Sequence, residues 1–310
     1  MLWDDLGIPH QERKQIHGTS IPVIGIQVDP NNMTYTLPGE SHAKLLAELE
    51  LWTNKKGSRH TVRRWQHMAG WMNWCFNVFP LLRPALCNVY DKLRNKTNPA
   101  GSIWINNAVR DDLRWALEKI KSSSGRYLLD AIAWTSADAT FTIFCDTCPA
   151  GLGFWYPALK LGFFSPTPLD DLHGLADRNG LIFYFEALCV LCALRDACAH
   201  HQTPSGRFLI YTDNLNTVNL FSSLSALPSY NVLLREAVNL LVNGSHDLRV
   251  LHVPGVDNSV ADALSRADFD RALTLEPQLT IHQFEPYHRV KRGEVFSLQP
   301  PQDQMGAVQK

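Results

Sequence analysis

The chain of 310 residues lacks a long uninterrupted hydrophobic run, a secretion signal and any sizeable net charge. Its longest apolar segment, Leu181 to Leu194, is interrupted by Glu186 and is shorter than the roughly 20 residues that a membrane-spanning helix needs. The N-terminus has no basic stretch followed by an apolar one, so we expect no signal peptide. We therefore predict an intracellular protein that has no membrane partner.

The cysteines do not indicate a disulfide framework. The chain has 7, an odd number, and it is long enough to form a hydrophobic core, so a disulfide framework is not expected. Two Cys-x-x-Cys pairs, Cys145 with Cys148 and Cys189 with Cys192, raise the question of zinc. The first pair ends a strand-like run and the second lies inside an apolar helix, whereas structural zinc pairs usually sit on tight turns. We favour small buried core residues over zinc ligands.

The formal charge of -1 hides a strong asymmetry along the chain. Residues 1–54 carry 3 basic and 7 acidic groups, residues 55–126 carry 14 and 4, and residues 127–310 carry 12 and 19. The hydrophobic content of 45% excludes disorder across the whole chain, which needs low hydrophobicity together with high net charge. A basic middle beside an acidic remainder indicates a nucleic-acid contact surface joined to a different activity.

The first part of the chain predicts a hairpin followed by a small helical bundle. Two β-like runs, at 23–28 and 33–37, flank a turn with Pro30 at its second position, which indicates the hairpin. Apolar residues at intervals of three and four then indicate helices. These helices are expected at 43–52, 61–78, 81–93 and 105–120.

The pattern changes after Ser122-Ser-Ser-Gly125. Three strand-like segments are followed by a long helix, a strand, two helices, a last strand and a last helix. This order predicts an α/β fold with a mixed five-stranded sheet and flanking helices. We expect five parts: a hairpin at 1–38, a basic helical region at 39–121, a linker at 122–138, the α/β domain at 139–270 and a flexible tail at 271–310.

Four carboxylates of the α/β domain have no obvious partner in the sequence. Asp146 and Asp213 each end a strand, Glu186 is the one charge in its apolar segment, and Asp262 lies near the start of the last helix. An unpaired carboxylate among apolar side chains is costly, and no basic residue follows on that helix until Arg195. If neighbouring strands bring their ends together, the four could hold two Mg²⁺ ions about 4 Å apart, which suits displacement at phosphate. Turn caps and a helix-dipole partner are the alternatives.

The four carboxylates lie in four ordered motifs: Asp146-Thr-Cys-Pro-Ala-Gly-Leu-Gly-Phe-Trp155, Phe185-Glu-Ala-Leu-Cys-Val-Leu-Cys-Ala-Leu194, Tyr211-Thr-Asp-Asn214 and His252-Val-Pro-Gly-Val-Asp-Asn-Ser-Val-Ala-Asp-Ala-Leu-Ser-Arg266. These motifs resemble the RNase H domain of retrotransposon reverse transcriptases, and among them the DIRS-like group of fungi and protists. The resemblance implies an RNase H-like fold and a metal-dependent endonuclease that cuts the RNA strand of RNA·DNA hybrids. It implies Mg²⁺, or alternatively Mn²⁺, at the set Asp146, Glu186, Asp213 and Asp262.

The front of the chain shows a weaker resemblance to the same proteins. Leu6-Gly-Ile-Pro9, Lys14 and Val23-Ile-Gly-Ile-Gln-Val-Asp29 resemble the end of a reverse transcriptase palm and its primer-grip hairpin, and the following helices resemble the thumb and connection. No Asp-Asp pair follows a strand in the Tyr-x-Asp-Asp manner of a polymerase, and only three residues precede Asp4. We therefore expect no DNA synthesis by this chain alone, and the remaining reverse transcriptase domains could act in trans.

The basic region and one motif supply the predicted nucleic-acid contacts. These residues are Lys55, Lys56, Arg59, Arg63, Arg64 and Asn214. For each of the basic side chains, a solvated helix face is an equally good alternative.

Some departures from the family pattern leave alternatives open. Cellular RNases H have a basic protrusion between the third and fourth carboxylates, whereas residues 214–248 contain only Arg235 as a basic residue. Many RNases H also have a catalytic-loop histidine shortly before the last aspartate. His252 lies on the strand before that loop, so it is expected to be structural rather than catalytic. The alternatives to a ribonuclease H are a catalytically inactive or co-opted nucleic-acid-binding fragment, and an integrase- or resolvase-like nuclease that cuts DNA.

Overall fold

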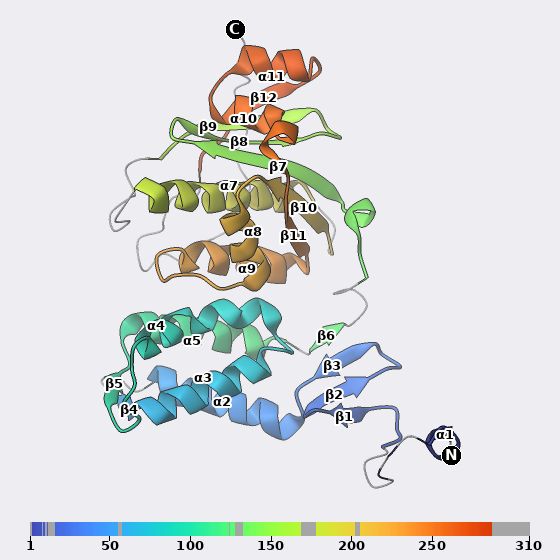
Figure 1. The fold of residues 1–310 in the computed structure, drawn as a ribbon, viewed down its shortest axis with the longest axis vertical. Coiled ribbons are helices and arrows are strands. Elements are labelled where there is room, and N and C mark those ends of the chain that lie inside the picture. Colours follow the sequence, from blue (N-terminus) through green and yellow to red (C-terminus); the bar gives the residue numbers. More distant parts are fainter. Residues whose placement is uncertain are drawn as a thin grey trace. The chain divides into compact units, whose positions relative to one another are not determined.

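The computed structural model describes residues 2–7, 9, 11, 16–54, 58–123, 125–127, 133–168, 178–201 and 205–286. The chain divides into two compact units, Met1–Ala133 and Trp134–Lys310, each with its own sheet and helices (Figure 1). Within the described ranges, no helix is both long enough and apolar enough to cross a membrane.

The first unit has a small antiparallel sheet, in which the predicted hairpin is present. Its strands are in the order β1 (Ile21–Val23), β2 (Ile26–Asp29), β3 (Thr34–Thr36) and β6 (Arg126–Tyr127). The Asp29 side chain accepts hydrogen bonds from the backbone N–H groups of Asn31 and Asn32 at 3.0 Å, which closes the turn between β2 and β3. The strand β6 lies inside the segment at 122–138 that we expected to be a linker, and the two units divide within the same segment, after Ala133.

Helices fill most of the rest of the first unit. They are α1 (Leu2–Asp5), α2 (Gly39–Asn54), α3 (Val62–Cys75), the 3-10 helix η2 (Pro80–Leu86), α4 (Cys87–Leu93) and α5 (Asn107–Lys121). Trp52 of α2 and Trp65 of α3 are fully buried and meet edge to face, with ring centroids 4.9 Å apart. A two-stranded sheet that the sequence did not indicate, β4 (Arg59–Thr61) with β5 (Ser102–Trp104), joins the start of α3 to the start of α5.

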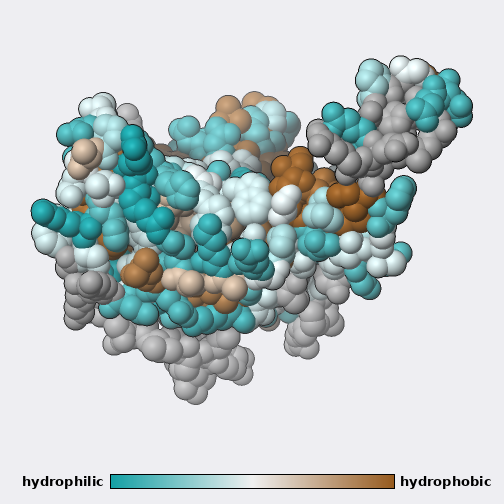
Figure 2. Space-filling model, turned by 90° about the horizontal axis from the view of Figure 1, so that it is seen from below, coloured by the Kyte–Doolittle hydropathy of each residue, from teal (hydrophilic) through white to brown (hydrophobic). Residues whose placement is uncertain are grey.

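Seen from below in Figure 2, this unit presents a largely hydrophilic surface broken by separate apolar patches. Val23, Ile24 and Leu51 are among its exposed apolar side chains. Ile24 lies at the tight turn between β1 and β2, has a φ of 51° and exposes 88% of its surface. A β-branched residue rarely adopts this backbone conformation, so the turn is a strained point of the unit.

The second unit is built around a mixed six-stranded sheet in the order β11–β10–β7–β8–β9–β12. The strands are β7 (Phe141–Cys148), β8 (Gly151–Tyr156), β9 (Leu161–Pro166), β10 (Arg207–Thr212), β11 (Asp247–His252) and β12 (Thr280–Gln283). The strands β7, β8 and β9 are antiparallel neighbours, whereas β10 runs parallel to both β7 and β11. The predicted α/β class and mixed sheet are confirmed.

The predicted number of strands is wrong, because β12 adds a sixth strand that pairs parallel to β9. It belongs to the segment from 271 onwards that we expected to be a flexible tail. That expectation is wrong for the described residues up to 286, since Leu279 is buried there and packs with Leu264 and Ala272. Residues 287–310 of the predicted tail lie outside the described residues.

Helices cover both faces of this sheet (Figure 1). The helical elements of this unit are η3 (Ser136–Asp138), α7 (Arg178–His200), α8 (Leu215–Ser223), α9 (Asn231–Gly244), η4 (Gly255–Asp257), α10 (Ser259–Ser265) and α11 (Phe269–Leu275). On one face, the Thr147 hydroxyl meets the Phe185 carbonyl oxygen of α7 at 3.4 Å. On the other, the Ser265 hydroxyl of α10 meets Asp146 at 2.6 Å, so two helices enclose the end of β7.

Candidate functional site: an acidic centre at the strand ends

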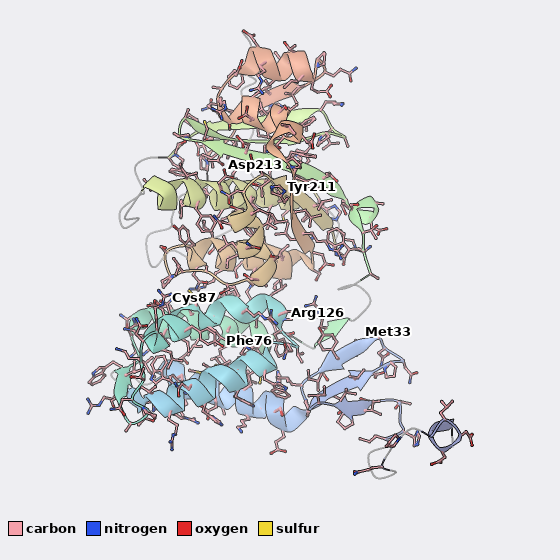
Figure 3. All side chains as sticks on the ribbon, viewed as in Figure 1. Met33, Phe76, Cys87, Arg126, Tyr211 and Asp213 are labelled. Carbon is pink, nitrogen blue, oxygen red and sulfur yellow. The ribbon has the colours of Figure 1, made fainter. Side chains whose placement is uncertain are left out.

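Two of the predicted carboxylates lie side by side because their strands are parallel neighbours. Thr212 of β10 pairs with Cys145 of β7, and the next residues are Asp213 and Asp146. Asp213 therefore follows directly after β10, where Figure 3 labels it, and Asp146 lies next to it on β7. The strand register thus brings these two acidic side chains to the same end of the sheet.

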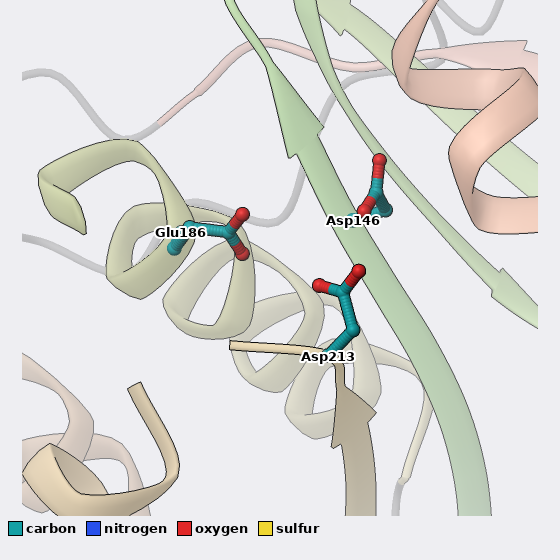
Figure 4. Close-up of side chains that lie close together, drawn as sticks. All are labelled: Asp146, Glu186 and Asp213. Carbon is teal, nitrogen blue, oxygen red and sulfur yellow. The ribbon is translucent and has the colours of Figure 1, made fainter. Parts of the chain in front are cut away.

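The third carboxylate comes from the helix that covers this end. Glu186 lies on α7 and faces the two aspartates in Figure 4. Each of the three residues offers a carboxylate oxygen, and these oxygens all lie within 4.8 Å of one another. Asp146 and Glu186 are only 6% and 5% exposed, whereas Asp213 is exposed, so the group is buried on one side and open to solvent on the other.

This placement is costly for the negative charges. Burial, with the nearby charges of Asp213 and Asp262, raises the pKa of Asp146 to about 6, although the Ser265 hydroxyl acts in the opposite direction. Burial and the charges of Asp146 and Asp213 raise the pKa of Glu186 to about 9. No Lys or Arg side chain in the described ranges forms an ion pair with any of the three. The charge compensation that such a group needs could come from a divalent metal ion bound by oxygen ligands.

Neighbouring polar groups hold two of these carboxylates in place. The Ser265 hydroxyl donates to Asp146 Oδ2 at 2.6 Å. The Thr212 hydroxyl lies 3.5 Å from Glu186 Oε2. The buried Asn258 donates from Nδ2 to the Cys145 carbonyl oxygen at 2.9 Å, which ties the loop before α10 to the strand that carries Asp146. Ser265 and Asn258 are positioning residues that sequence reasoning missed.

The helix α10 reaches this position because two glycines of β8 leave room for it. A Cβ atom added at Gly153 would lie 2.5 Å from the Ser265 backbone nitrogen, and one at Gly151 would lie 2.8 Å from the Ser265 carbonyl oxygen. Either contact is too close for any other residue. The two glycines of the first motif therefore permit the approach that brings Ser265 to Asp146.

The fourth predicted carboxylate has a different environment. Asp262 lies on α10, but its carboxylate does not belong to the group of three. Arg266 Nε donates to its Oδ1 at 2.6 Å, and Arg271 Nη1 donates to its Oδ2 at 2.7 Å. These hydrogen bonds lower the pKa of Asp262 in spite of its partial burial. The structure therefore brings together three of the four predicted carboxylates and places the fourth in an ion pair with two arginines.

The predicted nucleic-acid contacts have mixed outcomes. Lys55 and Lys56 lie outside the described residues. Arg59 and Arg63 are exposed, and the guanidinium group of Arg59 lies 5.4 Å from the ring centroid of the exposed Trp104. Two further predicted contacts, Arg64 and Asn214, already have partners within the protein.

Those two residues have structural roles. Arg64 Nη2 lies 2.6 Å from both carboxylate oxygens of Glu48 on α2, so it joins α3 to α2 and is a weaker candidate for phosphate binding. Asn214 accepts hydrogen bonds from the backbone N–H groups of Asn216 and Thr217 and is the N-cap of α8. A role in binding nucleic acid would therefore need the Asn214 amide nitrogen, since its oxygen is engaged.

The cysteines around the site contact the backbone. The Cys148 thiol lies 3.1 Å from the Ser265 carbonyl oxygen, and the Cys189 thiol lies 3.4 Å from the Gly153 carbonyl oxygen. Cys145 and Cys189 are fully buried, and all seven cysteines are free thiols. Burial raises the pKa of Cys189 well above its ordinary value, which keeps this thiol neutral.

Comparisons with known proteins give little that bears on function. No protein-family model matches the chain, and no curated protein matches it. Among solved structures, the chain is similar to the foamy viral protease-reverse transcriptase in complex with RNA/DNA hybrid, with 9% sequence identity and a TM-score of 0.29. The similarity covers 83% of this chain and 53% of the viral one, so the chain spans about half the length of that protein. Its function has to be inferred from the site itself.

Proposed function

We propose that the second unit is a metal-dependent ribonuclease H that cuts the RNA strand of RNA·DNA hybrids. The observation that carries this proposal is the group Asp146, Glu186 and Asp213, whose oxygens lie within 4.8 Å of one another at the end of a mixed sheet. These residues come from three of the motifs that resemble the RNase H domain of DIRS-like reverse transcriptases. The sequence resemblance and the geometry therefore point to the same residues.

The chemistry of the group supports Mg²⁺, with Mn²⁺ as a substitute. Carboxylate oxygens are the ligands that hard divalent cations prefer, and the three residues provide no nitrogen or sulfur ligand. When bound, such ions lower the pKa of water and stabilise the charge that develops on a leaving oxygen. Glu186 and Asp146 would have to give up any bound proton before they could serve as ligands, because a coordinating carboxylate is ionised.

The residues of this chain would fix the geometry of that reaction. Ser265 holds Asp146 through its hydroxyl group, and burial on α7 holds Glu186 on the far side of the group. Asp213 is exposed and is therefore the carboxylate that an approaching phosphodiester would meet first. An enclosed side and an open side are what a nuclease site needs in order to admit a polymer.

The basic first unit is proposed to bind the hybrid through its phosphates. Residues 55–126 carry 14 basic and 4 acidic groups, and Arg59 and Arg63 are exposed. Contacts of this kind bind without regard to sequence and weaken with salt. We propose that this unit corresponds to the thumb and connection of a reverse transcriptase, with the hairpin as a remnant of the palm.

A strand-specific cleavage assay tests this proposal. An RNA·DNA hybrid labelled separately on each strand is incubated with the full chain in Mg²⁺, in Mn²⁺ and in EDTA. We expect RNA cleavage in either metal, none in EDTA, and a loss of about a hundredfold or more for Asp146→Asn, since the electrostatic contribution of one such group is of that order. The matched control is Asp257→Asn, which removes an exposed carboxylate of the same unit.

The assay also separates the alternatives. Cleavage of duplex DNA in preference to the hybrid would indicate an integrase- or resolvase-like nuclease. Salt-sensitive binding without turnover in either metal, by a folded protein, would favour the inactive nucleic-acid-binding fragment and overturn the ribonuclease proposal.

A further inference from the structure

The ion pair between Asp262 and two arginines lies beside the acidic centre and has no evident structural purpose. Arg266 is in the turn that ends α10, and Arg271 is on α11, so the two guanidinium groups reach Asp262 from consecutive helices. Their side chains remain 57% and 45% exposed. Exposed ion pairs add little to stability, because the gain in water is small and holding long side chains costs entropy.

Apolar packing already fixes α11 without these arginines. Ala272 of α11 is fully buried against Leu264 of α10 and Leu279, and Phe269 and Leu273 pack against this cluster. The Asp268 side chain caps α11 by accepting from the Arg271 backbone N–H at 3.2 Å. The Arg271 side chain is therefore free to exchange partners while its helix stays in place.

One of these arginines, Arg266, is close enough to the acidic centre to influence it. The positive charge of Arg266 lowers the pKa of Asp146, and the charge of Asp262 raises it. Ser265, next to Arg266 in the chain, donates directly to Asp146. A phosphate bound at the acidic centre would therefore feel the positive charge of Arg266, and Arg271 contacts the same Asp262 carboxylate as Arg266.

We infer that Arg266 and Arg271 form a phosphate clamp that holds Asp262 until a nucleic acid replaces it. Two non-bridging phosphate oxygens accept from a pair of guanidinium groups much as the two carboxylate oxygens of Asp262 do now. When the arginines turn to the phosphate, Asp262 is released and its carboxylate becomes available to a divalent ion. Substrate binding would thus make the fourth carboxylate, Asp262, available as a metal ligand.

This inference rests on the proposed function, because it assigns the clamp to the phosphates of the same nuclease site. Before substrate binds, the protein should offer one strong cation position at Asp146, Glu186 and Asp213. A second should be weak, because Asp262 has both oxygens occupied by arginine donors. In this scheme the two arginines bind the substrate phosphate directly and act on the metal site through Asp262.

Titration with Mn²⁺ in the absence of nucleic acid tests the clamp without any need for turnover. The electron paramagnetic resonance signal measures free Mn²⁺, and the number of bound ions is the difference from the total. It is measured for wild type, Arg271→Gln and Arg266→Gln. Removing one nearby positive charge and freeing one carboxylate oxygen should tighten the second, weaker Mn²⁺ roughly three- to tenfold. Arg271→Lys, which keeps the charge and loses the planar fork, should lie between wild type and the glutamine variant.

Two further variants isolate the cause. In the background of Asp262→Asn, Arg271→Gln should tighten Mn²⁺ binding much less, because only the positive charge is removed and the carboxylate that it would release is absent. Lys160→Gln is the matched control, since Lys160 forms an ion pair of similar length, 2.6 Å against 2.7 Å, with Glu276 just after α11 rather than with Asp262. It should leave Mn²⁺ binding unchanged.

Hybrid binding supplies the opposite readout. In Ca²⁺, fluorescence anisotropy should show that Arg271→Gln binds a labelled RNA·DNA hybrid roughly three- to tenfold more weakly, with a shallower dependence on salt. Tighter Mn²⁺ binding with weaker hybrid binding supports the clamp. Unchanged Mn²⁺ binding in both arginine variants, with normal circular dichroism, overturns it and leaves a surface ion pair.

The two proposals fail in different ways. If the wild type cuts hybrids but the arginine variants leave Mn²⁺ binding unchanged, the clamp is wrong and the ribonuclease stands. If Mn²⁺ binding tightens as expected but no nucleic acid is cut, the release of Asp262 is supported and the ribonuclease is wrong.

Discussion

Replacement of Asp146 by asparagine should stabilise the metal-free protein while it abolishes the response to metal. The pKa of Asp146 is raised from 3.8 to about 6 in the folded state, mainly by burial. The folded protein therefore binds this proton more tightly than the unfolded chain does. The contribution of the protonated Asp146 to the free energy of unfolding is therefore fully present below about pH 4, and it is lost as the pH rises through about 6.

The size of the effect follows from the shift in pKa. A difference of about two units corresponds to about 3 kcal/mol at pH 8, and about half of that is already lost at pH 5. An asparagine has nearly the same shape, can still accept from Ser265 and carries no charge. The variant should therefore be more stable than wild type by up to about 3 kcal/mol at pH 8, which is roughly 6–12 °C for a unit of this size.

Scanning calorimetry in EDTA at pH 5 and pH 8 measures this difference, and a second set of scans adds Mg²⁺. Wild type should lose stability from pH 5 to pH 8 and regain it with Mg²⁺, whereas Asp146→Asn should show a smaller pH dependence and little response to the metal. Asp257→Asn, at an exposed position, should behave as wild type. An Asp146→Asn protein that is less stable than wild type at pH 8 in EDTA would refute the reasoning from burial.

Three further predictions concern neighbouring groups. Because the pKa of Glu186 is raised to about 9, metal binding at pH 7 should release a proton from this side chain. Isothermal titration calorimetry in buffers of different ionisation enthalpy should detect about one proton released per bound ion. If no proton is released, the assignment of Glu186 as a ligand is wrong. Gly153→Ala places a Cβ atom 2.5 Å from the Ser265 backbone nitrogen, so chemical denaturation should show that the free energy of unfolding falls by about 1–3 kcal/mol. In the control Gly70→Ala, the added Cβ meets nothing within 4 Å, so this variant should be as stable as wild type or slightly more stable. Ser265→Ala removes a hydrogen bond that lowers the pKa of Asp146, so the inflection of metal affinity against pH should move to higher pH, and an unchanged profile would show that the bond is unimportant.

Hydrophobic patterning was sufficient to predict the α/β class and most of the sheet. The strands β7 and β10 are apolar runs with an aspartate near the end of β7 and directly after β10, so the meeting of Asp146 and Asp213 followed from parallel pairing. Glu186 was predictable because a lone carboxylate in an apolar helix needs a partner. These signals are local in the sequence, and burial on both sides of the sheet makes them strong.

The parts that the sequence did not reveal depend on contacts between distant segments. The strand β12 is four residues long and partly polar, and it is fixed by pairing with β9 rather than by a pattern of its own. Arg271 lies beyond the predicted end of the domain at 270, so its contact with Asp262 could not be anticipated. Ser265 and Asn258 are small polar residues whose hydrogen bonds to β7 exist only after α10 packs on the glycines of β8.

The most direct test of the ribonuclease proposal is the chemistry of the ends that cleavage produces. An RNA strand cut in a hybrid with Mg²⁺, in water enriched in ¹⁸O, is digested and its fragments are weighed by mass spectrometry. If Asp146, Glu186 and Asp213 hold the metal that activates water, each new end should be a 3′-hydroxyl or a 5′-phosphate that contains one ¹⁸O atom, and Asp146→Asn should yield none. Cyclic 2′,3′-phosphate ends, or the same products in EDTA, would contradict the account.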